Sequence, residues 1–190
     1  SNASGSVISG NTIFTSINQL TTDWWWSSPL GNYGGDDGLG LYSGAIEAQN
    51  CDNCEIDGNS ITGPPAGMGN GFTAMGPAGG ISSPNSEDAI ISNNVMDVSF
   101  TGINAENSNG ITIEYNQITD FWDIGIYFAN SAHSTIRYNR LIGGEYSSVG
   151  MANNSDNQNS VISNNYIQIQ SGSHYNHDQS IVGLIAHDAT

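Results

Sequence analysis

Acidic side chains stand close together at several points of this 190-residue chain. Asp36 and Asp37 are adjacent in a glycine-rich segment, Asp120 and Asp123 flank a Phe-Trp pair, and Glu145 follows further along. Two neighbouring carboxyl groups can hydrolyse a glycosidic bond, because one protonates the leaving oxygen while the other acts as base or nucleophile. Adjacent acids in a glycine-rich loop also suit a Ca²⁺ ion or a solvated turn. The acids therefore predict either catalysis or cation binding.

A second candidate for proton transfer lies in the segment Ser-His-Tyr-Asn-His-Asp near the end of the chain. His177 and Asp178, with His174 beside them, are residue types that exchange protons near neutral pH. The alternative is that these polar side chains only meet solvent.

Aromatic residues accompany these acids, and their ring faces can stack on the apolar faces of sugars. The alternative is that they pack loops onto the body of the protein. The candidate sugar-binding residues are Trp24, Trp25, Trp26, Tyr33, Trp122, Tyr146 and Tyr175, and Phe121 belongs to the same group.

Six asparagines recur at matched points and must position these residues. Each follows an aliphatic residue three places earlier and precedes another apolar residue two places later. They are Asn11, Asn59, Asn94, Asn116, Asn139 and Asn165. Upstream of each one except Asn11 lies a second pattern, a small residue and then Ile or Met. It is followed by a polar column of asparagines at Asn50, Asn85, Asn107 and Asn130.

Short alternating strands with two asparagine turns per repeat are typical of a parallel β-helix. Inward aliphatic side chains would stack from coil to coil, and the amide groups of asparagine would form a ladder at the corners, where asparagine also tolerates a left-handed backbone. We therefore predict one all-β domain over residues 4–190, with about six coils. Ser1, Asn2 and Ala3 match the remnant of a cleaved expression tag.

The connection after each ladder asparagine varies greatly in length. It is long from Asn11 to Ala45 and from Asn59 to Gly80, and short from Asn94 to Gly102. The other connection is nearly constant. All insertions should thus leave along one side of the solenoid, termed the insertion edge, where repeat proteins commonly bind their ligands. The acids and aromatic residues above fall on this edge.

Four other residues have structural explanations. Arg137 occupies the outward column of Glu114 one coil earlier, so a salt bridge between coils is expected. Cys51 replaces a serine of the repeat and Cys54 an inward aliphatic residue, which favours buried small residues over a metal site and leaves a local disulfide open.

The composition excludes several classes of partner. Two Arg and no Lys against eighteen Asp and Glu give a net charge of −16, which repels nucleic acids and anionic lipids. A bare polyanionic polysaccharide would also be repelled unless calcium bridged it to the protein. No apolar stretch approaches the roughly eighteen residues of a membrane span. Scarce lysine with abundant Asn, Ser, Gly and Thr favours an extracellular or cell-surface location.

The pattern Gly-Ile-x-x-x-Asn-Ser followed by Ile-x-x-Asn-x-Ile, over about residues 44–170, resembles the right-handed parallel β-helix repeats of the pectin-lyase-like superfamily. That superfamily includes polysaccharide lyases, mannuronan epimerases, glycoside hydrolases and phage tailspikes. The resemblance implies the fold and a carbohydrate partner. Its lyase and epimerase motif of the type Tyr-Gly-x-Asp-Pro-His is approached by Tyr175-Asn176-His177-Asp178, without the proline and in altered order.

Two hypotheses for function follow. The first is a secreted carbohydrate-active protein that binds a polysaccharide at the insertion edge and cleaves it as a hydrolase, with lyase or epimerase chemistry as further alternatives. The second is a non-catalytic module, such as a surface adhesin segment or a tailspike-like shaft. Exposed coils at the ends of the solenoid would leave unpaired strand edges through which such a module could self-associate.

Overall fold

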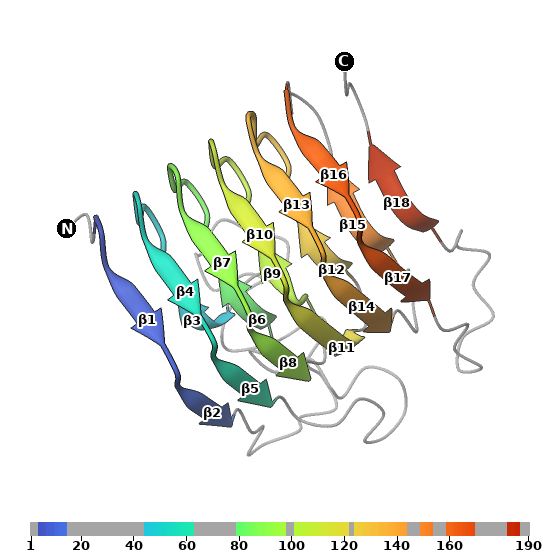
Figure 1. Ribbon diagram of the computed structural model, residues 1–190, viewed down its shortest axis with the longest axis horizontal. Helices are drawn as coiled ribbons and strands as arrows, with labels where there is room; N and C mark the ends of the chain where they lie inside the picture. The colour runs from blue at the N-terminus through green and yellow to red at the C-terminus, as the bar shows by residue number, and fades with distance from the viewer. Residues whose placement is uncertain are drawn as a thin grey trace, which may run out of the picture.

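The computed structural model describes residues 4–14, 44–62, 79–97, 101–121, 124–143, 149–153, 159–169 and 182–186. These residues form three parallel sheets of six strands each and, within those ranges, no helix. Successive strands along the chain belong to different sheets, so each coil of the solenoid contributes one strand to every sheet (Figure 1). The predicted parallel β-helix of about six coils is confirmed.

The three sheets are termed A, B and C. Sheet A contains β1 (Val7–Ser9), β4 (Glu55–Asp57), β7 (Ile90–Ser92), β10 (Thr112–Glu114), β13 (Thr135–Arg137) and β16 (Val161–Ser163). Sheet B contains β2 (Thr12–Phe14), β5 (Ser60–Thr62), β8 (Val95–Asp97), β11 (Gln117–Phe121), β14 (Arg140–Gly143) and β17 (Tyr166–Ile169). Sheet C contains β3 (Gly44–Glu47), β6 (Gly79–Ser82), β9 (Ile103–Asn104), β12 (Ile124–Tyr127), β15 (Val149–Asn153) and β18 (Val182–Ala186).

The core is a column of aliphatic side chains from each sheet, aligned by the strand register. In sheet A the column is Ile8, Ile56, Ile91, Ile113, Ile136 and Ile162. In sheet B it is Ile13, Ile61, Met96, Ile118, Leu141 and Ile167. The members from the middle coils are buried, and those of the first and last coils are partly buried against them. A period of two along each short strand places these residues inside and their neighbours outside.

The asparagine ladder runs along the corner between sheets A and B. The Nδ2 atom of Asn59 donates to Oδ1 of Asn94 at 2.9 Å, and Asn94 and Asn116 continue the series with bonds of 3.0 Å to the next coil. Each Nδ2 also donates to a backbone carbonyl of the coil before it, as Asn116 does to Ile91 at 2.9 Å. The ladder from Asn59 to Asn139 is buried, so it satisfies polar backbone groups inside the solenoid.

One detail of the prediction was wrong. The left-handed backbone at this corner belongs to the residue before each ladder asparagine and not to the ladder asparagine itself. Those residues are Gly10, Gly58, Asn93, Tyr115, Tyr138 and Asn164. The ladder asparagine must instead turn its amide inward, parallel to the axis. By contrast, the second asparagine column, Asn50, Asn85, Asn107 and Asn130, has the expected positive φ.

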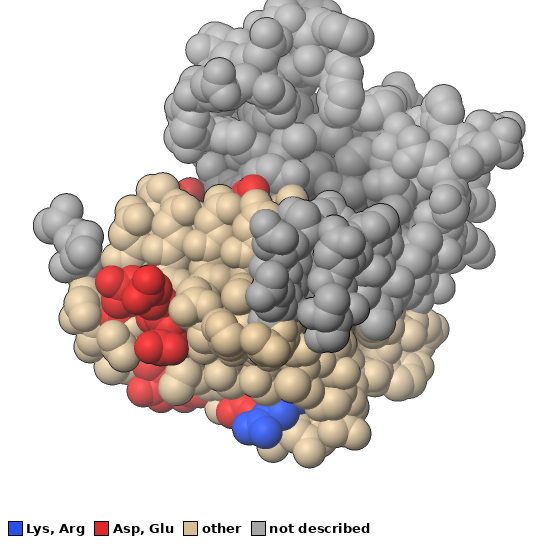
Figure 2. Space-filling model, turned by 90° about the horizontal axis from the view of Figure 1, so that it is seen from above, with Lys and Arg blue, Asp and Glu red and all other residues tan. Residues whose placement is uncertain are grey.

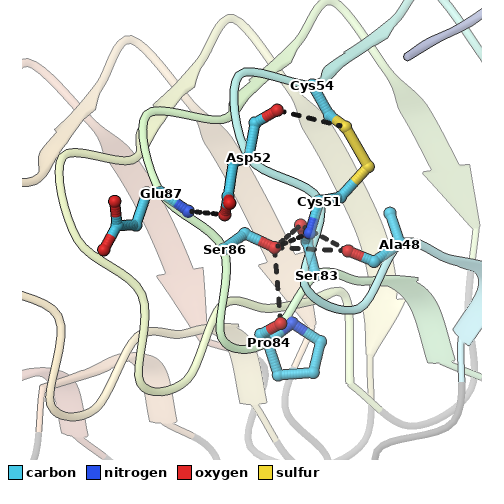
Figure 3. Close-up of a disulfide and its surroundings, with 8 residues drawn as sticks. All are labelled: Ala48, Cys51, Asp52, Cys54, Ser83, Pro84, Ser86 and Glu87. Carbon is cyan, nitrogen blue, oxygen red and sulfur yellow. Dashed lines mark hydrogen bonds between the residues drawn. A yellow bond between two sulfur atoms is a disulfide. The ribbon is translucent and has the colours of Figure 1, made fainter. Parts of the chain in front are cut away.

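Cys51 and Cys54 form a disulfide in the turn between sheets C and A (Figure 3). Both are buried, as predicted, and the backbone N–H of Cys51 donates to Oγ of Ser86 at 3.1 Å. Ser86 in turn donates its N–H to Oγ of Ser108, so Cys51 stands at the end of a serine ladder. The alternative of a disulfide, left open by the spacing of the two residues, is the one observed.

Candidate functional site

The insertion edge lies between sheets B and C. The connection from β2 to β3 comprises residues 15–43, that from β5 to β6 comprises residues 63–78, and that from β17 to β18 comprises residues 170–181. By contrast, only residues 122 and 123 separate β11 from β12, and every connection from sheet A to sheet B is a two-residue corner. The prediction that the long connections all leave from one side of the solenoid is therefore confirmed.

Two carboxylates come together on this edge in neighbouring coils. Asp97 is the last residue of β8, and its partner in the register of β11 is Thr119. Asp120 follows Thr119 directly, at a point where the register of β11 against β14 shifts by a bulge. Its backbone is left-handed, with φ of 56°. A bulge re-aims a side chain at the margin of a sheet, and both acids are exposed there.

The electrostatics of the two acids couple them. Burial raises the pKa of the Asp97 carboxyl, and the negative charge of Asp120 raises it further. Asp97 as a whole residue is nevertheless exposed, so water screens the pair and the effect on the pKa is partial. Chemically, an environment that holds the proton more tightly on one carboxyl than is usual suits that carboxyl to act as an acid, and leaves its neighbour as base or nucleophile.

A contrasting acid shows that this raised pKa is local. Asp57, in sheet A, accepts hydrogen bonds from Oγ of Ser92 at 2.8 Å and from Nδ2 of Asn93 at 2.7 Å. The bond from Asn93 and then the bond from Ser92 lower the pKa of Asp57. The same residue type is thus stabilised in its charged form on sheet A and disfavoured in that form on the insertion edge.

Thr101 adds a polar group at the start of the coil that follows Asp97. Its side chain is buried, and its hydroxyl has no hydrogen-bond partner among the described residues. The backbone carbonyl of Thr101 accepts from the N–H of Gly80 at 2.9 Å, which fixes the residue at the sheet C side of the edge. A buried hydroxyl without a partner is costly unless a ligand or water meets it, and the sequence repeat contains no signal for it.

Of the candidate catalytic residues, only Asp120 lies in the described part of the chain. Asp36, Asp37, Asp123, Glu145, His177 and Asp178 lie outside it. The candidate sugar-binding residues Trp24, Trp25, Trp26, Tyr33, Trp122, Tyr146 and Tyr175 lie outside it as well. All of these remain predictions. Only the structure shows that Asp97 lies beside Asp120, since the repeat does not reveal the bulge at Asp120.

Two alternatives were open for the aromatic residues, sugar binding and packing against the body of the protein, and Phe121 follows the second. Its side chain is fully buried in the core. It packs in the space that a Cβ atom at Gly143 of the next coil would occupy, so the glycine there makes room for the ring. The bulge at Asp120 explains why the ring points inward, because an extra residue reverses which side chains of the strand point inward.

Metal ligands do not gather in the part of the chain that the structure describes: no group of three or more His, Cys, Asp or Glu residues could hold an ion there. Asp36 and Asp37, for which a Ca²⁺ site was suggested, lie outside the described residues, so that site stays a prediction. Among the described residues, none forms a helix long and apolar enough to cross a membrane. The expected salt bridge is present, with Nε of Arg137 at 2.7 Å from Oε2 of Glu114.

A model of the right-handed β-helix region matches residues 38–184 of the chain. The chain belongs to the right-handed β-helix family. No curated protein matches this β-helix protein.

Among solved structures, this β-helix protein is similar to DFA-IIIase from Arthrobacter chlorophenolicus A6 in complex with GF2. The TM-score is 0.53, and the identity is 16% over 70% of the length of the β-helix protein. The same enzyme without its lid gives a TM-score of 0.45 at 17% identity, over 67% of the β-helix protein and 26% of the enzyme. The chain spans 29% of the enzyme in the first comparison. At this identity the likeness shows the fold alone.

Proposed function

We propose that this β-helix protein is carbohydrate-active and binds a polysaccharide along the insertion edge, where Asp97 and Asp120 carry out glycosidic bond hydrolysis. The observation that carries the proposal is the coupled pair of acids, in which burial and the charge of Asp120 raise the pKa of Asp97. The similarity in fold to DFA-IIIase, a carbohydrate-active enzyme, supports the class of substrate.

In the proposed reaction the protonated carboxyl of Asp97 gives its proton to the leaving glycosidic oxygen. Asp120, ionised, either removes a proton from the attacking water or attacks the anomeric carbon itself. Adjacent strands of a sheet lie about 4.8 Å apart, and side chains on them can spread further. A separation of about 5 to 5.5 Å would retain the anomeric configuration, and about 6.5 to 9.5 Å would invert it.

The test is a screen of neutral polysaccharides for new reducing ends and for unsaturated products, followed by variants on the active substrate. Asp97→Asn should lower the hydrolytic rate by about 100-fold or more, the usual contribution of a general acid. Asp120→Asn should do the same. Glu55→Gln is the matched control, since Glu55 is an exposed carboxylate on sheet A, away from the edge. A rate unchanged by Asp97→Asn and Asp120→Asn would refute the assignment, and unsaturated products would favour a lyase.

A non-catalytic module is the second candidate, and the first coil supports it. Strands β1 and β2 are terminal in their sheets, and the described coil exposes Val7 and Phe14. Unpaired edges with exposed apolar side chains favour association with a further coil or a second copy. Glycan binding without any product, together with concentration-dependent association in analytical ultracentrifugation, would favour this candidate.

An extracellular or cell-surface location is part of the proposal. The disulfide between Cys51 and Cys54 supports it, because disulfides persist mainly in oxidising compartments. Detection of free thiols at both positions in protein taken directly from its native source would argue against that location.

A further inference from the structure

The corner between sheets A and B carries a cluster of exposed aromatic and cationic side chains that the insertion edge does not explain. Arg137 ends β13, Arg140 begins β14, and Tyr138 lies in the corner between them. Tyr115 occupies the equivalent corner of the preceding coil, and Tyr166 begins β17 in the next coil of sheet B. These five residues are termed the tyrosine–arginine platform. In Figure 2 the blue surface of the two arginines is separate from the larger red cluster of acidic side chains.

The backbone indicates that the two corner tyrosines are present for their side chains. Tyr115 and Tyr138 have φ of 56° and 55°, in the left-handed region where bulky residues are strained. The equivalent residue of the other coils is glycine or asparagine, which accept that conformation at little cost. The tyrosine rings stack in parallel, with centroids 5.1 Å apart and 8° between their planes.

The platform is open to solvent. Tyr115, Tyr138 and Tyr166 are 52%, 45% and 54% exposed, and they are the only tyrosines among the exposed large hydrophobic residues of the described chain. Packing within the solenoid therefore does not account for them, since the core is filled by the aliphatic columns and by Phe121 and Phe128. Exposed rings together with guanidinium groups are typical of surfaces that recognise ligands.

The two arginines differ in their partners. Arg137 is held by Glu114 at 2.7 Å and lies over the ring of Tyr138, 5.8 Å from its centroid. Arg140 lies over the ring of Tyr166 at 5.7 Å, and no described carboxylate forms a salt bridge with it. In a chain with a net charge of −16, Arg140 thus presents a guanidinium that is free to pair with an incoming anion.

We propose that the tyrosine–arginine platform binds a sugar unit that bears one carboxylate, as a uronate does, within an otherwise neutral glycan. The planar fork of Arg140 suits bidentate hydrogen bonds to a carboxylate, while the exposed tyrosine rings meet the apolar surface of the sugar ring. A long polyuronate does not fit, because each further carboxylate meets the negative field of the protein. A single acidic unit meets Arg140 at close range, within one Debye length of about 8 Å.

This site is separate from the insertion edge, since sheet B lies between the two corners. The inference therefore goes beyond the proposed function and does not depend on catalysis by Asp97 and Asp120. The two sites can fail or succeed separately in experiment.

The experiment is an NMR titration of the ¹⁵N-labelled chain with methyl glucuronide, with methyl glucoside and acetate as the two comparison probes. We expect methyl glucuronide to shift the signals of Tyr138 and Arg140, and to bind at least about fivefold more tightly than either comparison probe. Equal binding of methyl glucoside would remove the role of the carboxylate, and equal binding of acetate would remove the role of the sugar ring. Either result would overturn the proposal, as would the absence of any shift at the platform.

Charge variants sharpen the test. Arg140→Gln should weaken binding of methyl glucuronide about tenfold without changing the melting temperature, because its side chain is exposed. Glu114→Gln should strengthen binding several-fold, since it releases Arg137 from its salt bridge. Glu55→Gln changes the net charge by the same amount at a distant position of sheet A and should leave the affinity unaltered. Equal gains from Glu114→Gln and Glu55→Gln would reduce the effect to overall charge and overturn the proposal.

An unchanged titration for Asp97→Asn is also expected. That result separates the platform from the insertion edge, whose own test is the loss of hydrolysis in the same variant. If Asp97→Asn abolished glucuronide binding, the platform would not be the site.

Discussion

Removing one side chain from the middle of the asparagine ladder should destabilise the protein far more than removing one from its end. Asn116 is buried, and its Oδ1 atom accepts the backbone N–H of Asn94 at 3.0 Å. Its Nδ2 atom donates to the carbonyl of Ile91 at 2.9 Å and to Oδ1 of Asn139 at 3.0 Å. Asn116→Ala removes all of these bonds at once.

The magnitude follows from which groups are left without a partner. The N–H of Asn94 loses its acceptor, and the carbonyl of Ile91 loses a donor. The Oδ1 atom of Asn139 keeps the backbone N–H of Asn116, so it remains satisfied. An unsatisfied buried polar group costs about 1 to 3 kcal/mol. The N–H of Asn94 is such a group, whereas the carbonyl of Ile91 keeps its place in the parallel ladder with β10 and Nδ2 of Asn94 keeps the carbonyl of Ile56. Adding about 1 kcal/mol for each of the two bonds that these satisfied groups lose gives a loss of about 4 kcal/mol in the free energy of unfolding.

Asn11→Ala is the matched control at the exposed end of the same ladder. Asn11 donates to Oδ1 of Asn59 at 2.9 Å from its side chain and at 3.1 Å from its backbone. The backbone bond survives the substitution, and water can reach the groups that remain. The expected loss is about 1 kcal/mol, the net contribution of one ordinary hydrogen bond.

Urea denaturation followed by circular dichroism measures both variants. Because coils of a solenoid can unfold separately, hydrogen exchange at the amides of β10 and β13 provides a second, local measurement of the same difference. If the two variants lose equal stability within about 1 kcal/mol, the argument that burial makes the ladder decisive would be refuted.

Three further predictions concern charge, cross-linking and close packing. At pH 7 the raised pKa of Asp97 destabilises the fold and the lowered pKa of Asp57 stabilises it, so Asp97→Asn should raise the urea midpoint and Asp57→Asn should lower it. The difference for Asp97→Asn should vanish as the pH falls below the ordinary aspartate pKa of about 3.9, where this carboxyl is protonated in folded and unfolded chains alike. The difference for Asp57→Asn should persist to lower pH, because the folded chain holds the pKa of Asp57 below that ordinary value. A difference for Asp97→Asn that remained at about pH 2, or one for Asp57→Asn that was lost at the higher pH of the two, would contradict the assignment. Reduction of the disulfide between Cys51 and Cys54 should lower the free energy of unfolding by about 2 kcal/mol, because the unfolded chain gains loop-closure entropy. The loss is measured as a lower urea midpoint in dithiothreitol. An unchanged midpoint would show that hydrogen bonds alone fix the turn. Gly102→Ala should destabilise the fold by about 1 to 3 kcal/mol, because the added Cβ would meet a backbone carbonyl of the next coil. A melting temperature equal to that of the parent protein would contradict this, since it would show that the coils can separate to admit the Cβ.

The coils and their register were predictable because the repeat records them directly. An aliphatic residue at a fixed distance from each ladder asparagine has the same neighbours in every coil, so one alignment of the repeats places the strands of all three sheets. The insertion edge was predictable for the same reason, since only one connection varies in length. The long connections expected after Asn11 and Asn59 follow the strands β2 and β5 that these asparagines precede.

Features that the sequence could not predict arise where one coil departs from the repeat. The bulge at Asp120 adds a residue to β11, and as a result Phe121 points into the core and Asp120 comes beside Asp97. No spacing rule could reveal this, because the repeat aligns Thr119 and not Asp120 with Asp97. A bulge depends on packing between coils, here the pairing of Phe121 with the glycine of the following strand.

The tyrosine–arginine platform does not follow from the repeat for a different reason. The salt bridge with Glu114 accounts for Arg137 within the repeat, so the spacing alone gives no reason for a ligand there. The signal was present in the sequence, since Tyr115 and Tyr138 stand immediately before ladder asparagines, where other coils have glycine or asparagine. Once the structure shows a left-handed backbone at that position, the two tyrosines become exceptions that need an explanation.

In a solenoid, equivalent positions of different coils share nearly the same backbone and neighbours, so each coil is a reference for the others. A residue that accepts a cost which its equivalents avoid has a reason outside the repeat. Tyr138 accepts a strained φ, and Asp97 accepts an unfavourable charge beside Asp120. Both lie on the surface, where stability alone would favour asparagine at the first position and a neutral side chain, as at Thr62 and Thr119 of the same column, at the second. These two departures, on opposite margins of sheet B, are therefore where ligands should be sought.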